Sequence, residues 1–137
     1  TGNEGANRSE DLVEQPCSTI RKKQMAALEA HMRLQFRKDL LKRLRRDLRD
    51  ETKEADDGHL LELIETGMVR ARTYGITIER DVSMYVFLMV LYSPHFEERE
   101  DMGWAKKILL KPDLNGEGKM RLIYQMLSSR QQEQTTR

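Results

Sequence analysis

Residues 70–92 read RARTYGITIERDVSMYVFLMVLY, and this stretch decides the fold because it contains a helix end, a turn and a helix start. Arg70 and Arg72 fall in the expected last turn of a helix, where cations meet the negative end of the helix dipole. Gly75 stands where helices commonly end in a left-handed residue, and Thr77 can cap the helix that follows. The stretch predicts two helices joined by a tight turn.

The second of these helices is apolar on almost every side. Glu79 and Asp81 occupy its first turn, Ser83 is the only polar residue of the run VSMYVFLMVLY, and a proline ends it. A helix without a polar face is enclosed by other elements, so residues 77–92 are expected to form the centre of the core. A strand is the competing interpretation, because valines and aromatic residues are frequent here, but the capped start and the length favour a helix.

Helical periodicity continues on both sides of this pair. A second helix, before the turn, is expected to start near Asp56 or Asp57, and WAKKILL and KMRLIYQML predict two helices after it. Further upstream, residues 19–49 predict a long first helix with an apolar residue at every fourth position: Leu28, Met32, Phe36, Leu40, Leu44 and Leu48. The predicted fold class is all-α, a single compact bundle of about five helices around the apolar central helix.

Composition divides the chain into three parts. Residues 1–17 mix glycine, asparagine, serine and acidic residues with little apolar content, which is typical of a disordered leader. Residues 18–127 form the expected helical domain, and residues 128–137 form a polar C-terminal tail. The single cysteine, Cys17, cannot form an internal disulfide and has no obvious base beside it, so its role stays open.

The composition and net charge limit the classes of partner. Hydrophobic residues make up 38% of the 137 residues and charged residues 34%, and the net charge of +1 provides no overall field for a nucleic acid or an anionic membrane. The longest apolar run, residues 84–92, is far shorter than the roughly 20 residues that a membrane-spanning helix needs. No secretion-signal pattern stands at the N-terminus. We expect a cytoplasmic protein without a membrane partner.

Sequence motifs of catalysis and metal binding are missing. The chain has no glycine-rich phosphate loop, no HExxH, no paired cysteines and no GxSxG. His31, His59 and His95 are not spaced as metal ligands, and the turn DLNGEG lacks the later ligands of a calcium loop. The carboxylates of 54–57 and 97–101 are interpreted as solvated groups. We expect no enzyme activity, no metal and no cofactor.

A basic run occupies residues 33–49, where eight cations stand against two acids and give a net charge of +6. It is either a phosphate-binding face or the solvated side of an amphipathic helix, followed by acidic residues at 50–57. The solvated side is favoured, because the run has few aromatic residues for base stacking. The possible basic face comprises Arg33, Arg37, Lys38, Lys42, Arg45, Arg46 and Arg49.

The two helices around Gly75 also have the order of a helix-turn-helix motif. A recognition helix must present polar side chains to base edges, whereas the helix after Gly75 presents apolar side chains past its first turn. DNA reading by this pair is therefore not expected.

Several stretches together resemble a known family. They are IETGMVRARTYGITIERDVSMY, LMVLYSPHF, GWAKKIL and GKMRLIY, with Phe36, Arg37, Leu40, Leu44 and Arg45 in the first helix. In these residues the chain is similar to small helical proteins encoded in type VI secretion gene clusters of Gram-negative bacteria, commonly beside effectors, spike proteins and effector adaptors. The resemblance covers about residues 24–127, and its most specific part is RARTYGITIERDV.

This resemblance implies an accessory protein, a co-adaptor or chaperone that binds a secreted effector or its adaptor without catalysis. The family's biochemical activity is undefined, so the resemblance assigns no catalytic residue. The chain departs from the family where SPHF at 93–96 stands in place of a GxDF pattern. It departs again where the acidic RDETKEADD at 49–57 stands in place of a proline-aromatic stretch.

Two other functions stay open at this point. An immunity protein would cover the basic site of a neighbouring toxin with the acidic segments 50–57 and 97–101. A nucleic-acid binder using residues 33–49 is less favoured. The expected partner contacts, each with a purely structural role as the competing interpretation, are Arg70, Arg72, Tyr74, Glu79, Arg80, Phe96 and Trp104. The sequence names neither the partner nor the oligomeric state.

Overall fold

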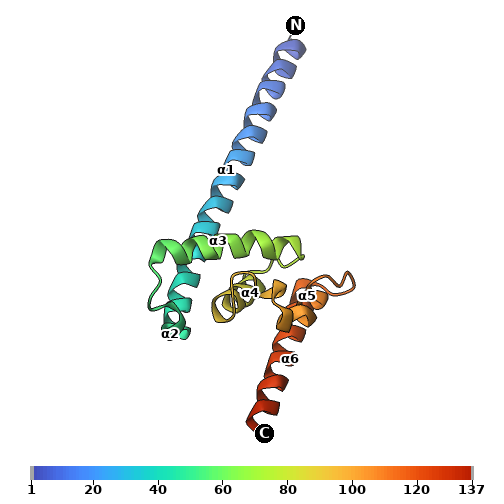
Figure 1. The fold of residues 1–137 in the computed structure, drawn as a ribbon. Helices are drawn as coiled ribbons and strands as arrows, with labels where there is room; N and C mark the ends of the chain where they lie inside the picture. Colours follow the sequence, from blue (N-terminus) through green and yellow to red (C-terminus); the bar gives the residue numbers. More distant parts are fainter. Residues whose placement is uncertain (1, 137) are drawn as a thin grey trace. The chain divides into compact units, whose positions relative to one another are not determined.

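The structure is a computed structural model that describes the backbone of residues 2–136 and the side chains of residues 20–130. Every regular element over these residues is helical, with six α-helices and two 3-10 helices (Figure 1). The all-α prediction is confirmed. The chain divides into two compact units, residues 1–36 and residues 37–137.

Helix α1 (Gly2–Asp47) begins well before Thr19, where the sequence predicted its start. Residue 17 is therefore not a boundary of secondary structure, although the prediction of a disordered leader stays a prediction. The side chains of that leader lie outside the described residues. The first unit consists of α1 alone, and its large apolar side chains between residues 20 and 34 are exposed.

In the second unit, the last turns of α1 enter the core. Leu40 and Leu44 are at most 1% exposed, and Leu48 follows on the same side. The helix ends at Asp47, slightly before its predicted end, and α2 (Arg49–Thr52) then turns the chain. The four-residue spacing thus places this part of the predicted stripe correctly.

The guanidinium of Arg45 stabilises the turn after α1 through three hydrogen bonds. Arg45 Nη2 donates to the carbonyl oxygen of Ala55 at 2.7 Å and to Asp57 Oδ1 at 2.6 Å. Its Nη1 donates to the carbonyl oxygen of Thr52. Because all three acceptors belong to the segment that leads into the next helix, Arg45 sets the path of this connection.

Helix α3 (Asp57–Thr73) begins and ends as predicted. At its N-terminus the side chain of Asp56 accepts a backbone N–H at 2.7 Å, as a capping carboxylate does. At its C-terminus Gly75 has a φ of 78°, which confirms the left-handed glycine. The N–H of Ile76 then donates to the carbonyl oxygen of Ala71 at 2.9 Å, the bond of a Schellman motif.

Helix α4 (Glu79–Leu91) is the central helix of the second unit and packs against α3 and α6 (Figure 1). Its N-cap is Ile78, which makes no side-chain capping bond, so the prediction that Thr77 caps this helix is wrong. Helical conformation starts one residue too late for the threonine to act. Close packing on α3 requires Gly67, where a Cβ would lie 2.7 Å from Val86 Cγ2.

Four more elements complete this unit: η1 (Phe96–Glu98), η2 (Glu100–Met102), α5 (Gly103–Leu109) and α6 (Gly116–Thr136). Helix α6 continues through most of the predicted polar tail. Its start lies against the α3–α4 joint, by which we mean residues 70–82, the end of α3, the turn and the start of α4. A Cβ on Gly116 would lie 2.9 Å from Ile76 Cα. Lys119 Nζ also donates to the carbonyl oxygen of Tyr74 at 2.7 Å. The α3–α4 joint is thus braced by α6.

Candidate partner-binding site

Among the described residues, no group of three or more His, Cys, Asp or Glu side chains is placed to hold a metal ion. His31, His59 and His95 are all exposed. Across the same residues no helix combines the length and apolarity needed to cross a membrane.

A buried carboxylate holds the joint from inside. Oε1 of Glu97, a residue only 3% exposed, accepts from the hydroxyl of Tyr85 at 3.1 Å and from the hydroxyl of Tyr74 at 3.4 Å. The guanidinium of Arg70 lies 3.7 Å from the same oxygen and donates to the carbonyl oxygen of Pro94. The interpretation of this carboxylate as a solvated group is wrong, because η1 turns it into the core.

The two phenols beside Glu97 have raised pKa values. Burial raises the pKa of Tyr85 above its ordinary value, and the neighbouring carboxylate of Glu97 adds to the rise. Burial and the same carboxylate also raise the pKa of Tyr74. Both phenols therefore stay protonated near neutral pH as donors to Glu97. Together these groups tie the segment after α4 back to α3 and α4.

Three of the expected contact residues belong to this internal network. Phe96 is 0% exposed and packs edge to face on Tyr85, with 5.2 Å between the ring centroids. The Arg70 side chain is only 18% exposed, and Tyr74 is half-buried. A fully buried ring cannot touch a partner, so Phe96 belongs to the core and not to a contact surface. Arg70 and Tyr74 both contact Glu97 and so stabilise the joint.

Three other predicted contact residues lie exposed on the outer side of the joint. Arg72 and Glu79 are exposed, and the Arg80 side chain is 64% exposed. Arg80 Nη2 lies 3.4 Å from Glu117 Oε1, a loose ion pair that leaves most of the guanidinium in water. These side chains emerge from a backbone that the Gly75 turn and α6 hold in place.

Ile78 is the residue of this surface that sequence reasoning missed. It is 56% exposed and occupies the N-cap of α4 without a capping hydrogen bond. Ser, Thr, Asp and Asn are strongly preferred at this position, and replacing one by an apolar residue typically costs about 1 kcal/mol. The signal in the sequence is an apolar residue directly before an acidic first turn, with the capping threonine one position too early.

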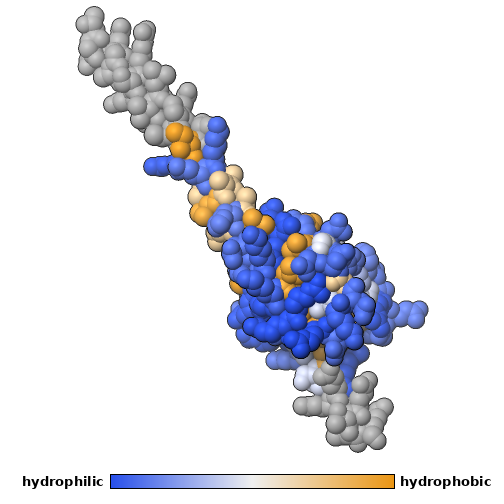
Figure 2. Space-filling view, turned by 90° about the vertical axis from the view of Figure 1, so that its left-hand side faces the viewer, coloured by the Kyte–Doolittle hydropathy of each residue, from blue (hydrophilic) through white to orange (hydrophobic). Residues whose placement is uncertain are grey.

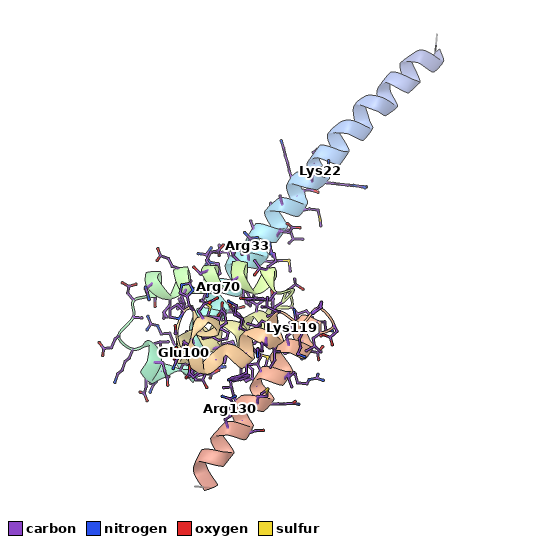
Figure 3. All side chains as sticks on the ribbon, turned by 45° about the vertical axis from the view of Figure 1, so that its right-hand side comes forward. Lys22, Arg33, Arg70, Glu100, Lys119 and Arg130 are labelled. Atoms are coloured by element: carbon purple, nitrogen blue, oxygen red, sulfur yellow. The ribbon has the colours of Figure 1, made fainter. Side chains whose placement is uncertain are left out.

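Trp104 is neither a core plug nor a free surface ring. It is half-buried, and its Nε1 donates to the carbonyl oxygen of Asp101 at 3.0 Å. The guanidinium carbon of Arg130, labelled in Figure 3, lies 4.4 Å from the ring centroid in a cation–π contact. The predicted contact role of Trp104 stays a prediction.

The predicted basic face is divided among separate structural partners. Arg37 Nη1 lies 3.6 Å from Glu65 Oε2, and Arg45 is occupied by the turn after α1. Arg46 Nε donates to Asp47 Oδ1 at 2.9 Å. A run of phosphate contacts would compete with these pairs for the three guanidinium groups. The remaining cations of the set are exposed: Arg33, Lys38, Lys42 and Arg49.

Large apolar side chains are exposed on α1 within the first unit, and Figure 2 shows them as orange along the helix next to the grey N-terminal residues. They are between 45% and 56% exposed: Ile20, Met25, Leu28, Met32 and Leu34. The sequence placed Leu28 and Met32 on one stripe with Leu40. However, each four-residue step turns roughly 40° further around a helix, so that stripe leaves the face on which it began.

Neither family models, nor curated proteins, nor solved structures contain a match to this chain.

Proposed function

We propose that the chain is a non-catalytic accessory protein that binds another protein through the outer side of the α3–α4 joint. Ile78 is the observation that carries this proposal. An apolar N-cap forgoes helix capping, which disfavours the protein on its own, and this one also leaves an apolar side chain in water. Real proteins break such local rules at functional sites, and a partner contact is one such site.

The surroundings of Ile78 suit a protein contact. Arg72, Glu79 and Arg80 place exposed charges of both signs on the same joint. An apolar centre with a charged rim is the usual composition of a specific interface. The rigid turn at Gly75 keeps the ordering entropy lost on binding small.

The resemblance to proteins of type VI secretion clusters supports a particular partner. We propose a secreted effector or its adaptor, with the chain acting in the cytoplasm as a co-adaptor or chaperone. The partner surface should offer an apolar pocket for Ile78 and carboxylates for Arg72 and Arg80.

The test uses the purified full chain and the purified product of an adjacent effector or adaptor gene. Ile78→Ser should weaken binding at least about tenfold and leave the melting temperature unchanged or higher, because serine is a favoured N-cap. Leu110→Ser is the matched control, since Leu110 is 60% exposed at the C-cap of α5. Equal binding by Ile78→Ser and wild type would show that Ile78 is not part of the binding site.

An immunity protein is the second candidate, favoured by exposed acids on and beside α2. Asp50, Glu51 and Glu54 are exposed and suit a basic toxin surface. Cells that produce the neighbouring effector should then be rescued by this chain alone, and Asp50→Asn with Glu51→Gln and Glu54→Gln should lose the rescue. Rescue that survives all three changes would exclude the acidic surface.

A nucleic-acid binder ranks third, supported only by the exposed cations left on α1. If this role is correct, binding of a labelled DNA duplex should weaken steeply between about 50 and 200 mM salt. Absent binding, or binding that ignores salt, would remove this role.

A further inference from the structure

The part of α1 in the first unit carries a narrow apolar seam. Met25, Leu28 and Met32 follow one another at spacings of three and four residues and are 52–56% exposed. Gln24 and His31 flank this seam on one side. A narrow seam with this spacing is typical of a coiled coil, whereas a helix that lies on a membrane needs a wider apolar face.

We propose that this seam pairs with the same seam of a second copy of the chain, with the two helices antiparallel. Antiparallel pairing places Met25 of each copy beside Leu28 of the other, which forms two central apolar layers. The next layer outward places Arg21 of one copy beside Met32 of the other. There the aliphatic stem of Arg21 covers the methionine, and its guanidinium reaches water.

Residues flanking the seam match in this arrangement. Lys22 and Glu29 are seven residues apart, so they occupy the same position of successive heptads on one flank. In an antiparallel pair each Lys22 lies opposite Glu29 of the second copy, which makes two equivalent ion pairs. On the other flank Gln24 of one copy lies opposite His31 of the other, where the amide and the imidazole can hydrogen-bond.

A parallel pair of the same helices is disfavoured. It would set Arg21 against Arg21 within the seam and would separate Lys22 from Glu29. A nucleic acid is a poorer occupant as well, because residues 20–35 include no Phe, Tyr or Trp for base stacking. The second copy is the occupant whose charges fit.

Over the described residues the seam is short, so the dimer should be weak and dependent on concentration. Helix α1 continues to Asp47, and its Leu40 and Leu44 are buried in the second unit. The seam helix therefore does not have to nucleate alone, which would be unfavourable for an isolated peptide of this length. This pairing is independent of the proposed contact at Ile78.

Sedimentation velocity of the full chain provides the first test. The mass should rise from 16.1 kDa toward twice that value as the concentration increases from about 1 to 200 μM. Leu28→Gln should weaken dimerisation at least about tenfold. Leu34→Gln is the matched control, because Leu34 is 45% exposed on the opposite side of α1 and should dimerise as wild type does.

The flanking charges test the antiparallel orientation. Lys22→Glu and Glu29→Lys should each weaken self-association, whereas a mixture of these two variants should form a heterodimer. The double variant Lys22→Glu/Glu29→Lys should restore the homodimer, because the exchanged charges again face each other. Both positions are exposed, so thermal melting should stay that of wild type and show that the fold is intact.

Several outcomes would overturn the pairing. A wild-type mass of 16.1 kDa at every concentration excludes it. Equal losses from Leu28→Gln and Leu34→Gln would exclude the seam, and failure of the double charge variant to restore the dimer would exclude the orientation. A monomeric chain in which Leu28→Gln abolishes binding of a purified adaptor would assign the face to that protein.

Discussion

The hydroxyl of Tyr85 lies 3.1 Å from Oε1 of Glu97, and these residues are 0% and 3% exposed. This hydrogen bond ties the 3-10 turn η1 to the central helix α4 inside the core. A buried hydrogen bond of this kind specifies one arrangement, because an unpaired carboxylate in the same place would be strongly unfavourable. The segment after α4 is therefore held in one position behind the α3–α4 joint.

Removing the carboxylate should destabilise the second unit. Glu97→Ala leaves the buried phenol of Tyr85 and the half-buried phenol of Tyr74 without their acceptor and removes the charge beside Arg70, so we expect a loss of about 2–4 kcal/mol in the free energy of unfolding. Urea denaturation followed by circular dichroism measures the change. Glu100→Ala, which alters an exposed carboxylate at the start of the next 3-10 helix, η2, should leave the transition midpoint unchanged. Equal effects of the two changes would contradict a role for the network.

Alkaline pH should unfold the protein through its buried phenols. Burial raises the pKa of Tyr85, Tyr74 and Tyr124 in the folded state above the ordinary value near 10. Ionisation above pH 10 therefore favours the unfolded chain, so stability is fully present below that pH and falls as the pH rises further.

Phenolate absorbance at high pH provides the measurement. Fewer than the four tyrosines of the chain should titrate while circular dichroism remains native. Tyr85→Phe removes one late-titrating phenol and should reduce the absorbance step that accompanies unfolding. Complete titration of all tyrosines near pH 10 in the folded protein would show that the phenols are not buried.

The turn between α3 and α4 should tolerate only glycine at position 75. Gly75 has a φ of 78°, so Gly75→Ala forces a side chain into the left-handed region and should cost about 1–2 kcal/mol. Gly103→Ala is the matched control. A Cβ on Gly103 meets nothing within 4 Å, and the residue has a helical φ of −58°, so alanine there should be neutral or stabilising. In thermal melts Gly75→Ala should unfold at a lower temperature than wild type, and Gly103→Ala should not.

Loss of the Arg45 guanidinium should loosen the connection between α1 and α3. Arg45→Met keeps most of the aliphatic stem and removes the donors to Thr52, Ala55 and Asp57, so we expect a loss of about 1–2 kcal/mol. Backbone amide hydrogen exchange should speed up first at residues 52–57, because this segment loses the side chain that anchors it and opens more often. Arg46→Met changes an equally charged neighbour that pairs with Asp47 at the surface, and exchange at 52–57 should not respond.

The helix ends were readable because their causes are local. Asp56 caps α3, and Gly75 ends it with a positive φ, and both depend on side chains within a few residues of the helix end. The apolar run of α4 was readable for the same reason, since the enclosure of a helix follows from its own composition. Thr77 shows the limit of local reasoning, because a shift of one residue at the helix start moved the N-cap to Ile78.

The contact surface was less predictable. Phe96 is an aromatic residue in a polar loop, and a sequence cannot distinguish an exposed ring there from one packed on Tyr85. Glu97 and Arg37 had the same ambiguity, because burial beside an oppositely charged or hydroxylated side chain depends on residues far away in the chain.

By itself the sequence determined the helical class, the central apolar helix and the turn at Gly75, because periodicity, capping and glycine geometry act over one or two helical turns. Only the tertiary structure decided which charges became internal: Glu97 lies in the core, and Arg45 serves a turn, whereas Arg80 stays largely in water. The tertiary structure also decided that Ile78 and the seam of Met25, Leu28 and Met32 remain exposed. Burial is a property of packed neighbours, and those neighbours are set by contacts between residues that are distant in the chain.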